Sequence, residues 1–151
     1  MKSAENTKFI GRVDRADFSE LELEDISIKI DTGAYTSSIH SHHIAEIIES
    51  EGKYLEFEIL DPEHEQYVSK KIRTKNYEVK AVKSSNGLTE ERFFIETTIT
   101  LFEQEYPIKL SLTDRGQMKH PILIGRRFLS SKFVVNTDLK NLSYKQKQKN
   151  H

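Results

Sequence analysis

Short stretches in which apolar and polar residues alternate dominate the chain, and this alternation is typical of half-buried β-strands. In residues 26–30, Ile26, Ile28 and Ile30 alternate with Ser27 and Lys29. Similar stretches predict strands over residues 9–13, 21–23, 54–60, 77–81, 93–101, 108–112 and 133–135. Residues 121–125 are apolar throughout, so we expect both faces of that strand to be buried. Many short strands with little helix predict a small β-barrel or sandwich.

Helices and turns take up the remaining positions. Residues 42–51 predict a short helix that directs Ile44, Ile47 and Ile48 inward and ends at Gly52, and residues 126–131 predict a second one. Residues 63–71 form a polar loop. Asn86-Gly87 tolerates positive φ at both positions, which favours a type I′ hairpin turn.

The length and composition indicate one domain. The chain has 151 residues, enough for one hydrophobic core. We assign residues 1–8 to a disordered N-terminus, 9–139 to the barrel domain and 140–151 to a flexible polar tail. With 36% hydrophobic residues, 31% charged residues and a net charge of -1, nothing attracts the chain to nucleic acid or to a membrane surface.

The compartment follows from what the sequence lacks. It has neither a long apolar run nor an apolar signal core near its N-terminus, so we predict a cytoplasmic protein. It also has no cysteine, which fits a reducing compartment and excludes disulfides, thiolate nucleophiles and cysteine metal sites.

The strand over residues 26–30 leads into Asp31-Thr32-Gly33-Ala34, the first candidate for chemistry. The threonine hydroxyl can hydrogen-bond, and the glycine lets backbone N–H groups approach the carboxylate closely. Asp-Thr-Gly alone is a common tripeptide, and an ordinary turn at a strand end is the competing interpretation.

A second segment, Ile122-Leu-Ile-Gly125-Arg126-Arg127-Phe-Leu129, favours the catalytic interpretation. The two segments in this order resemble the retropepsins, single-lobe aspartic proteases in which an apolar strand passes under the active-site loop and its glycine allows close packing. The chain is more closely similar to a retropepsin-like family labelled "ATP-dependent zinc protease" (RimB-like, associated with RimK-type glutamate ligases). The matching segments are Gly11-Arg12, 28–34, 36–40, 84–87, Glu91-Arg92, 112–115, Met118 and 121–127.

The resemblance implies a closed, all-β barrel of the acid-protease type with one or two short helices. It also implies an aspartic-type peptidase with Asp31, Thr32 and Gly33 at the catalytic site. Some members are encoded beside a ligase that adds glutamates to a ribosomal protein, and are implicated in removing those tails. Aspartic catalysis needs two carboxylates that share a proton, so one Asp-Thr-Gly per chain predicts a homodimer, with the 84–87 hairpin as a flap.

Residues for substrate binding follow from the same motifs. Arginine side chains at motif positions suit carboxylates, which makes an acidic or polyglutamate peptide the expected substrate. The alternative for Arg126 and Arg127 is that they cap nearby carbonyls or pair with acids. The predicted set is Ala34, His40, Ser85, Asn86, Gly87, Arg92, Arg115, Arg126 and Arg127.

The sequence gives little support for a cofactor. It contains neither His-Glu-x-x-His nor a cysteine pair, so its spacing does not support zinc, and it has no phosphate-binding loop for ATP. His40, His42 and His43 could hold a metal, but on a regular strand His43 points away from the other two. We therefore predict no metal ligands and assign these histidines a surface or helix-capping role.

Two other functions stay open. One is a non-catalytic module that binds acidic peptides, and the other is a zinc-dependent peptidase, as the family label says. A monomer would favour the binding module, or would require a second acid such as Asp114.

Overall fold

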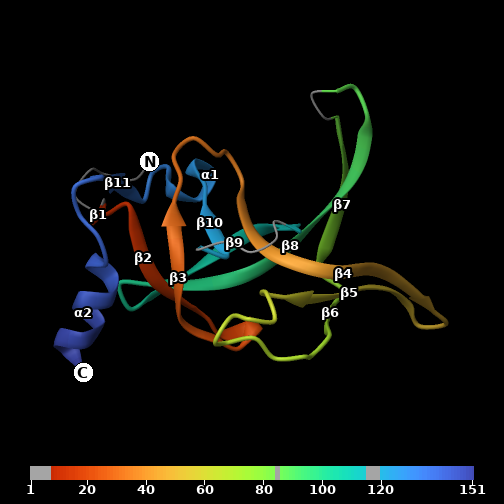
Figure 1. The fold of residues 1–151 in the computed structure, drawn as a ribbon, viewed down its shortest axis with the longest axis horizontal. Helices are drawn as coiled ribbons and strands as arrows, with labels where there is room; N and C mark the ends of the chain where they lie inside the picture. Colours follow the sequence, from red (N-terminus) through yellow and green to blue (C-terminus); the bar gives the residue numbers. More distant parts are fainter. Residues whose placement is uncertain (1–7, 84–85, 115–119) are drawn as a thin grey trace.

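Strand pairing closes six strands of the described chain into a barrel, in the order β10-β3-β2-β8-β9-β4 and back to β10 (Figure 1). The structure is a computed structural model that describes residues 8–83, 86–114 and 120–151. The strands are β1 (Lys8–Ile10), β2 (Val13–Phe18), β3 (Leu23–Ile30), β4 (Ser37–Glu49), β5 (Gly52–Ile59), β6 (Ile72–Thr74), β7 (Tyr77–Lys83), β8 (Thr89–Leu101), β9 (Gln104–Thr113), β10 (Ile122–Ile124) and β11 (Phe133–Val135). The helices are a 3₁₀ turn (Ser19–Leu21), α1 (Arg126–Leu129) and α2 (Leu142–Asn150). This architecture confirms the predicted all-β barrel with short helices.

Strand β10 closes the barrel. It runs parallel to β3, where Ile122 pairs with Ile28, and antiparallel to β4, where Ile122 pairs with Ile39. All three of its residues are buried, which confirms the expectation from its continuous apolar run. Because β3 leads into Asp31 and β10 leads into Gly125, their pairing brings the two sequence motifs together.

The alternation along β3 gives the barrel its interior. Ile26, Ile28 and Ile30 are buried in the hydrophobic core beside Phe18 and Leu110. Burying such side chains stabilises the fold by about 1.5–3 kcal/mol each. The core therefore fixes the end of β3, and with it the start of the loop at Asp31. The described chain contains no helix with the length and apolar character needed to span a membrane.

The predicted helix over residues 42–51 is wrong, since these residues belong to β4 and the turn that follows it. Strand β4 pairs with β5 from Ser41–Ile59 to Glu49–Gly52, with an irregularity between His42 and Ala45. Ile44, Ile47 and Ile48 have the i, i+3, i+4 spacing typical of a helix face, and the bulge shifts the phase of alternation in β4, so the sequence shows no regular strand pattern here. Ile48, expected to point inward, is 74% exposed.

The hairpin between β7 and β8 differs from the expected two-residue turn. Lys83 pairs with Thr89, so residues 84–88 lie between the strands. Gly87 has the positive φ, 86°, that its turn position favours. In Figure 1, β7 and the first part of β8 extend away from the barrel toward the top of the view, where the loop between β3 and β4 also lies.

Both ends of the described chain pack on the barrel. Lys8, at the edge of the segment expected to be disordered, pairs with Phe133, whereas residues 1–7 lie outside the described residues. The segment 140–151, expected as a flexible tail, contains helix α2. Buried Asp14 accepts hydrogen bonds from the backbone N–H groups of Ser143 and Tyr144, at 2.9 and 3.1 Å, in the first turn of α2. This long-range contact leaves no signal in the polar composition of the tail.

Candidate functional site

The end of β3 holds the carboxylate of Asp31 in a tight turn. The backbone N–H of Asp31 donates to the carbonyl of Ile124 in β10, at 2.9 Å. Asp31 Oδ1 accepts from the N–H of Gly33 at 3.0 Å, and Asp31 O accepts from the N–H of Ala34 at 3.1 Å. Asp31 is partly exposed, and Thr32 and Gly33 are exposed. A partly exposed carboxylate is thus fixed on a rigid strand end and remains accessible to a ligand.

The segment that joins β10 to α1 packs against this loop and is hydrogen-bonded to it. The N–H groups of Arg126 and Arg127 donate to the carbonyls of Ala34 and Tyr35, both at 2.9 Å. The N–H of Gly125 donates to Ser37 Oγ at 3.0 Å. A Cβ at Gly125 would lie 2.7–2.9 Å from backbone atoms of residues 34–36, so only glycine allows this approach.

The close approach explains why the two motifs belong together. Residues 31–37 and 124–127 form one hydrogen-bonded unit, although they lie far apart in the sequence. The backbone of the Asp-Thr-Gly loop is thus held by hydrogen bonds to β10 and to the start of α1. This is the rigid placement that a catalytic carboxylate needs.

The chain is similar to known proteins both in sequence and in structure. A model of the RimB-like family, described as "Retropepsin-like aspartic endopeptidase RimB", matches residues 9–146. The chain belongs to the RimB-like family. A crystal structure of a protein with unknown function from Legionella pneumophila is similar, with a TM-score of 0.69 and 25% sequence identity over 90% of this chain and 98% of that chain.

Curated relatives of this RimB-like chain carry a different name. A "Probable alpha-L-glutamate ligase" of Parasynechococcus marenigrum (strain WH8102) is 30% identical over 118 residues, 78% of this chain and 25% of the ligase. A protein of the same name from Shewanella pealeana (strain ATCC 700345 / ANG-SQ1) is 29% identical over 133 residues, 88% of this chain and 29% of the ligase. The chain therefore spans between a quarter and a third of the length of these relatives.

The two arginines after Gly125 occupy different surroundings. Arg126 Nη1 donates to the carbonyl of Thr32 at 3.2 Å, and its guanidinium lies 5.5 Å from the centre of the Tyr35 ring. Arg126 is therefore tied to the Asp31 loop and caps a carbonyl there, as the alternative interpretation expected. Arg127 is exposed and lines a cavity of about 280 Å³ with Lys109 and Lys132, and none of residues 31–34 lines that cavity.

The other predicted binding residues are spread over several elements. His40 is buried, and its Nδ1 lies 4.0 Å from Asp114 Oδ1. Arg92 lies on β8 and pairs with Glu90 at 3.4 Å. Asn86 and Gly87 are exposed in the β7–β8 connection. Ser85 and Arg115, predicted at the same site, lie outside the described residues.

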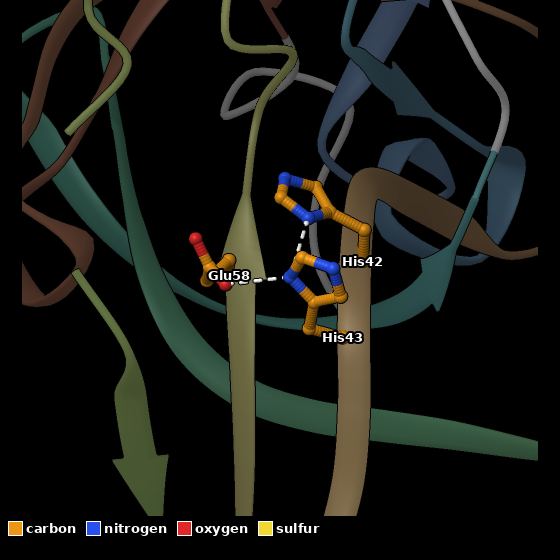
Figure 2. Close-up of side chains that lie close together, drawn as sticks. All are labelled: His42, His43 and Glu58. Atoms are coloured by element: carbon orange, nitrogen blue, oxygen red, sulfur yellow. Dashed lines mark hydrogen bonds and ion pairs between the residues drawn. The ribbon is translucent and has the colours of Figure 1, made fainter. Parts of the chain in front are cut away.

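Sequence reasoning missed one cluster, made of His42, His43 and Glu58 (Figure 2). His43 Nδ1 lies 2.7 Å from Glu58 Oε2 and 3.3 Å from His42 Nδ1. The hydrogen bond with His43 is the main reason that the pKa of Glu58 lies below its ordinary value. Glu58 is a polar residue of the alternating stretch 54–60, in which polar positions are expected to face solvent, but it is buried. The neighbouring histidines gave a signal in the sequence, but nothing in the sequence placed Glu58 beside them.

Proposed function

We propose that this chain is an aspartic-type peptidase in which Asp31 is the catalytic carboxylate. The observation that carries the proposal is the hydrogen-bonded unit formed by the Asp31 loop and the Gly125 step. The family's description as a retropepsin-like aspartic endopeptidase supports the same reaction.

The proposed mechanism uses two Asp31 side chains, one from each copy of a two-fold dimer. Because the sequence contains a single Asp-Thr-Gly, a second copy is the simplest source of the second acid. Two carboxylates a few ångströms apart cannot both ionise easily, so they share one proton. The ionised one removes a proton from water, whose oxygen attacks the carbonyl carbon of the peptide. The protonated one donates to the carbonyl oxygen, and collapse of this intermediate releases the amine after proton transfer to its nitrogen.

The loop's own contacts suit this role. The N–H of Gly33 donates to Asp31 Oδ1 and so holds the carboxylate in one orientation. Arg126 acts as a positioning residue, because its contact with the Thr32 carbonyl restrains the turn. Closure of the β7–β8 hairpin over a bound peptide would exclude water from the reacting atoms.

We further propose that the substrate is an acidic peptide, such as a glutamate tail. The guanidinium of Arg126 lies beside the Asp31 loop, and its donors other than the Nη1–H that meets Thr32 O suit a carboxylate of the substrate. The names of the curated relatives, glutamate ligases, are consistent with a substrate that carries added glutamates.

A second candidate is a module that binds acidic peptides without cutting them. The observation in its favour is that the chain matches only 25–29% of the length of the ligase relatives, where such a segment could serve recognition. Hydrolysis distinguishes the two candidates.

The experiment compares cleavage of a glutamate-tailed peptide with that of a glutamine-tailed peptide of equal length, followed by mass spectrometry. We expect faster cleavage of the glutamate tail and none by Asp31→Asn. Asp61→Asn is the matched control, because Asp61 Oδ1 accepts from the N–H of Glu63 at 2.9 Å in the same kind of turn. Equal rates on both tails would refute the acidic substrate, and binding without cleavage would favour the module.

A further inference from the structure

An unusual backbone conformation in β4 brings two neighbouring histidines to the same side of the strand. In a regular strand, successive side chains point to opposite faces. His43 has a φ of 54°, and the pairing with β5 is irregular between His42 and Ala45. As a result, both imidazoles lie beside Glu58 of β5 (Figure 2). A non-glycine residue in this conformation costs about 1–3 kcal/mol.

Three possible metal-ligand atoms converge in this cluster. His42 Nδ1 lies 3.3 Å from His43 Nδ1, which in turn lies 2.7 Å from Glu58 Oε2. A tetrahedral zinc ion with bonds of about 2.0–2.1 Å separates its ligand atoms by roughly 3.3–3.4 Å. The two nitrogens already stand at that separation. The three ligand atoms all lie within 4.8 Å of one another, so the Glu58 carboxylate has to rotate toward His42 by up to about 1.5 Å to complete a tetrahedral set.

The other hydrogen bonds of His42 and Glu58 use different atoms from those that face one another in the cluster. His42 Nε2 lies 3.0 Å from the carbonyl of Leu60, so it carries the proton and donates, and the lone pair is left on Nδ1. The hydroxyl of Tyr67 donates to Glu58 Oε1 at 3.2 Å, which leaves Oε2 for another partner. Metal-binding histidines and carboxylates are usually oriented by such second contacts.

Charge and access also suit a divalent cation. Glu58 supplies one negative charge from a position that is 7% exposed. The His43 side chain is 71% exposed, so an ion can enter from solvent and a water can complete its coordination. Two imidazoles and a carboxylate are a ligand set that zinc accepts.

We propose that His42, His43 and Glu58 bind a zinc ion that links β4 to β5. The site uses no residue of the Asp31 loop, so it goes beyond the proposed peptidase activity and can be tested without it. Zinc would replace the hydrogen bond between His43 and Glu58.

The test measures Zn²⁺ binding to the tag-free protein by competition with a chromophoric chelator. We expect one zinc per chain for the wild type and at least a tenfold loss of affinity in His43→Ala, whose exposed side chain can be removed without disturbing the core. Tyr67→Phe should weaken binding about tenfold through the lost second contact. His151→Ala is the matched control, because His151 Nε2 pairs with Glu103 Oε2 at 3.1 Å without a third ligand among the described residues, and this variant should bind zinc as the wild type does.

Thermal unfolding provides an independent measurement. Zinc should raise the Tm of the wild type and of His151→Ala relative to EDTA, and leave the Tm of His43→Ala unchanged. Absence of zinc binding by the folded wild type, or equal affinity in the wild type and His43→Ala, would overturn the proposal.

Discussion

Replacing Gly125 with alanine adds a single methyl group, but we expect it to displace the Asp31 loop. The added Cβ would meet Tyr35 O at 2.7 Å, Thr36 C at 2.8 Å and Ala34 O at 2.9 Å, whereas ordinary contact begins at 3.4 Å. All three are backbone atoms, so no flexible side chain can give way. The loop would have to move by the difference between 3.4 and 2.7 Å, about 0.7 Å.

The displacement determines how much stability and how much catalytic rate Gly125→Ala should lose. Two of the three atoms, Ala34 O and Tyr35 O, accept the hydrogen bonds from Arg126 and Arg127 that join the loop to α1. Overpacking of this kind costs about 1–3 kcal/mol of unfolding free energy. A misplacement approaching 1 Å at a catalytic group costs about 10²-fold in rate. We therefore expect Gly125→Ala to be folded, less stable and nearly inactive.

Urea unfolding followed by circular dichroism gives the stability, and cleavage of the glutamate-tailed peptide gives the rate. Gly52→Ala is the contrast, because a Cβ there meets nothing within 4 Å and only the positive φ of 126° is unfavourable. It should lose stability while keeping activity. If Gly125→Ala had the stability and rate of the wild type, the packed unit under Asp31 would be refuted.

Two further variants test the burial of charged groups. Asp14→Ala leaves the N–H groups of Ser143 and Tyr144 without their acceptor, so urea unfolding should show a loss of about 1–3 kcal/mol and α2 should exchange its amide hydrogens faster, whereas unchanged exchange would contradict the docking. The hydrogen bond from His43 lowers the pKa of Glu58 below its ordinary value of 4.5. The contribution of this hydrogen bond to the stability of the fold is therefore fully present above pH 4.5 and is lost as the pH falls through the pKa of Glu58 in the folded state. In EDTA, Glu58→Gln should therefore be less stable than the wild type at neutral pH, with a gap in stability that narrows on acidification. A gap independent of pH would refute the stabilisation of the ionised Glu58 carboxylate.

The sequence predicted those parts of the fold that depend on local pattern. The alternation of Ile26, Ile28 and Ile30 located β3, and the apolar run at residues 122–124 located a strand that is buried on both faces. The turn at Asp31 and the close approach at Gly125 could be expected from the resemblance, because both depend on short motifs.

Features that depend on long-range pairing could not be predicted in this way. The bulge at His43 shifts the alternation in β4, and therefore residues 42–51 resembled a helix and His43 was expected to point away from His42. The docking of α2 depends on Asp14, a residue on β2, so the composition of the tail alone could not reveal it. The partner of His43, Glu58, lies on another strand whose register the sequence does not specify.

Subunit mixing tests the central claim most directly, since the claim is that two copies each contribute one Asp31 to a shared site. Wild-type and Asp31→Asn chains are unfolded together, refolded in varied proportions and assayed for cleavage of the glutamate-tailed peptide. If both carboxylates are required, activity follows the square of the wild-type fraction, so an equal mixture retains about a quarter of the activity of the same total amount of wild-type chain. Activity linear in the wild-type fraction, or full activity of pure Asp31→Asn, would contradict the account.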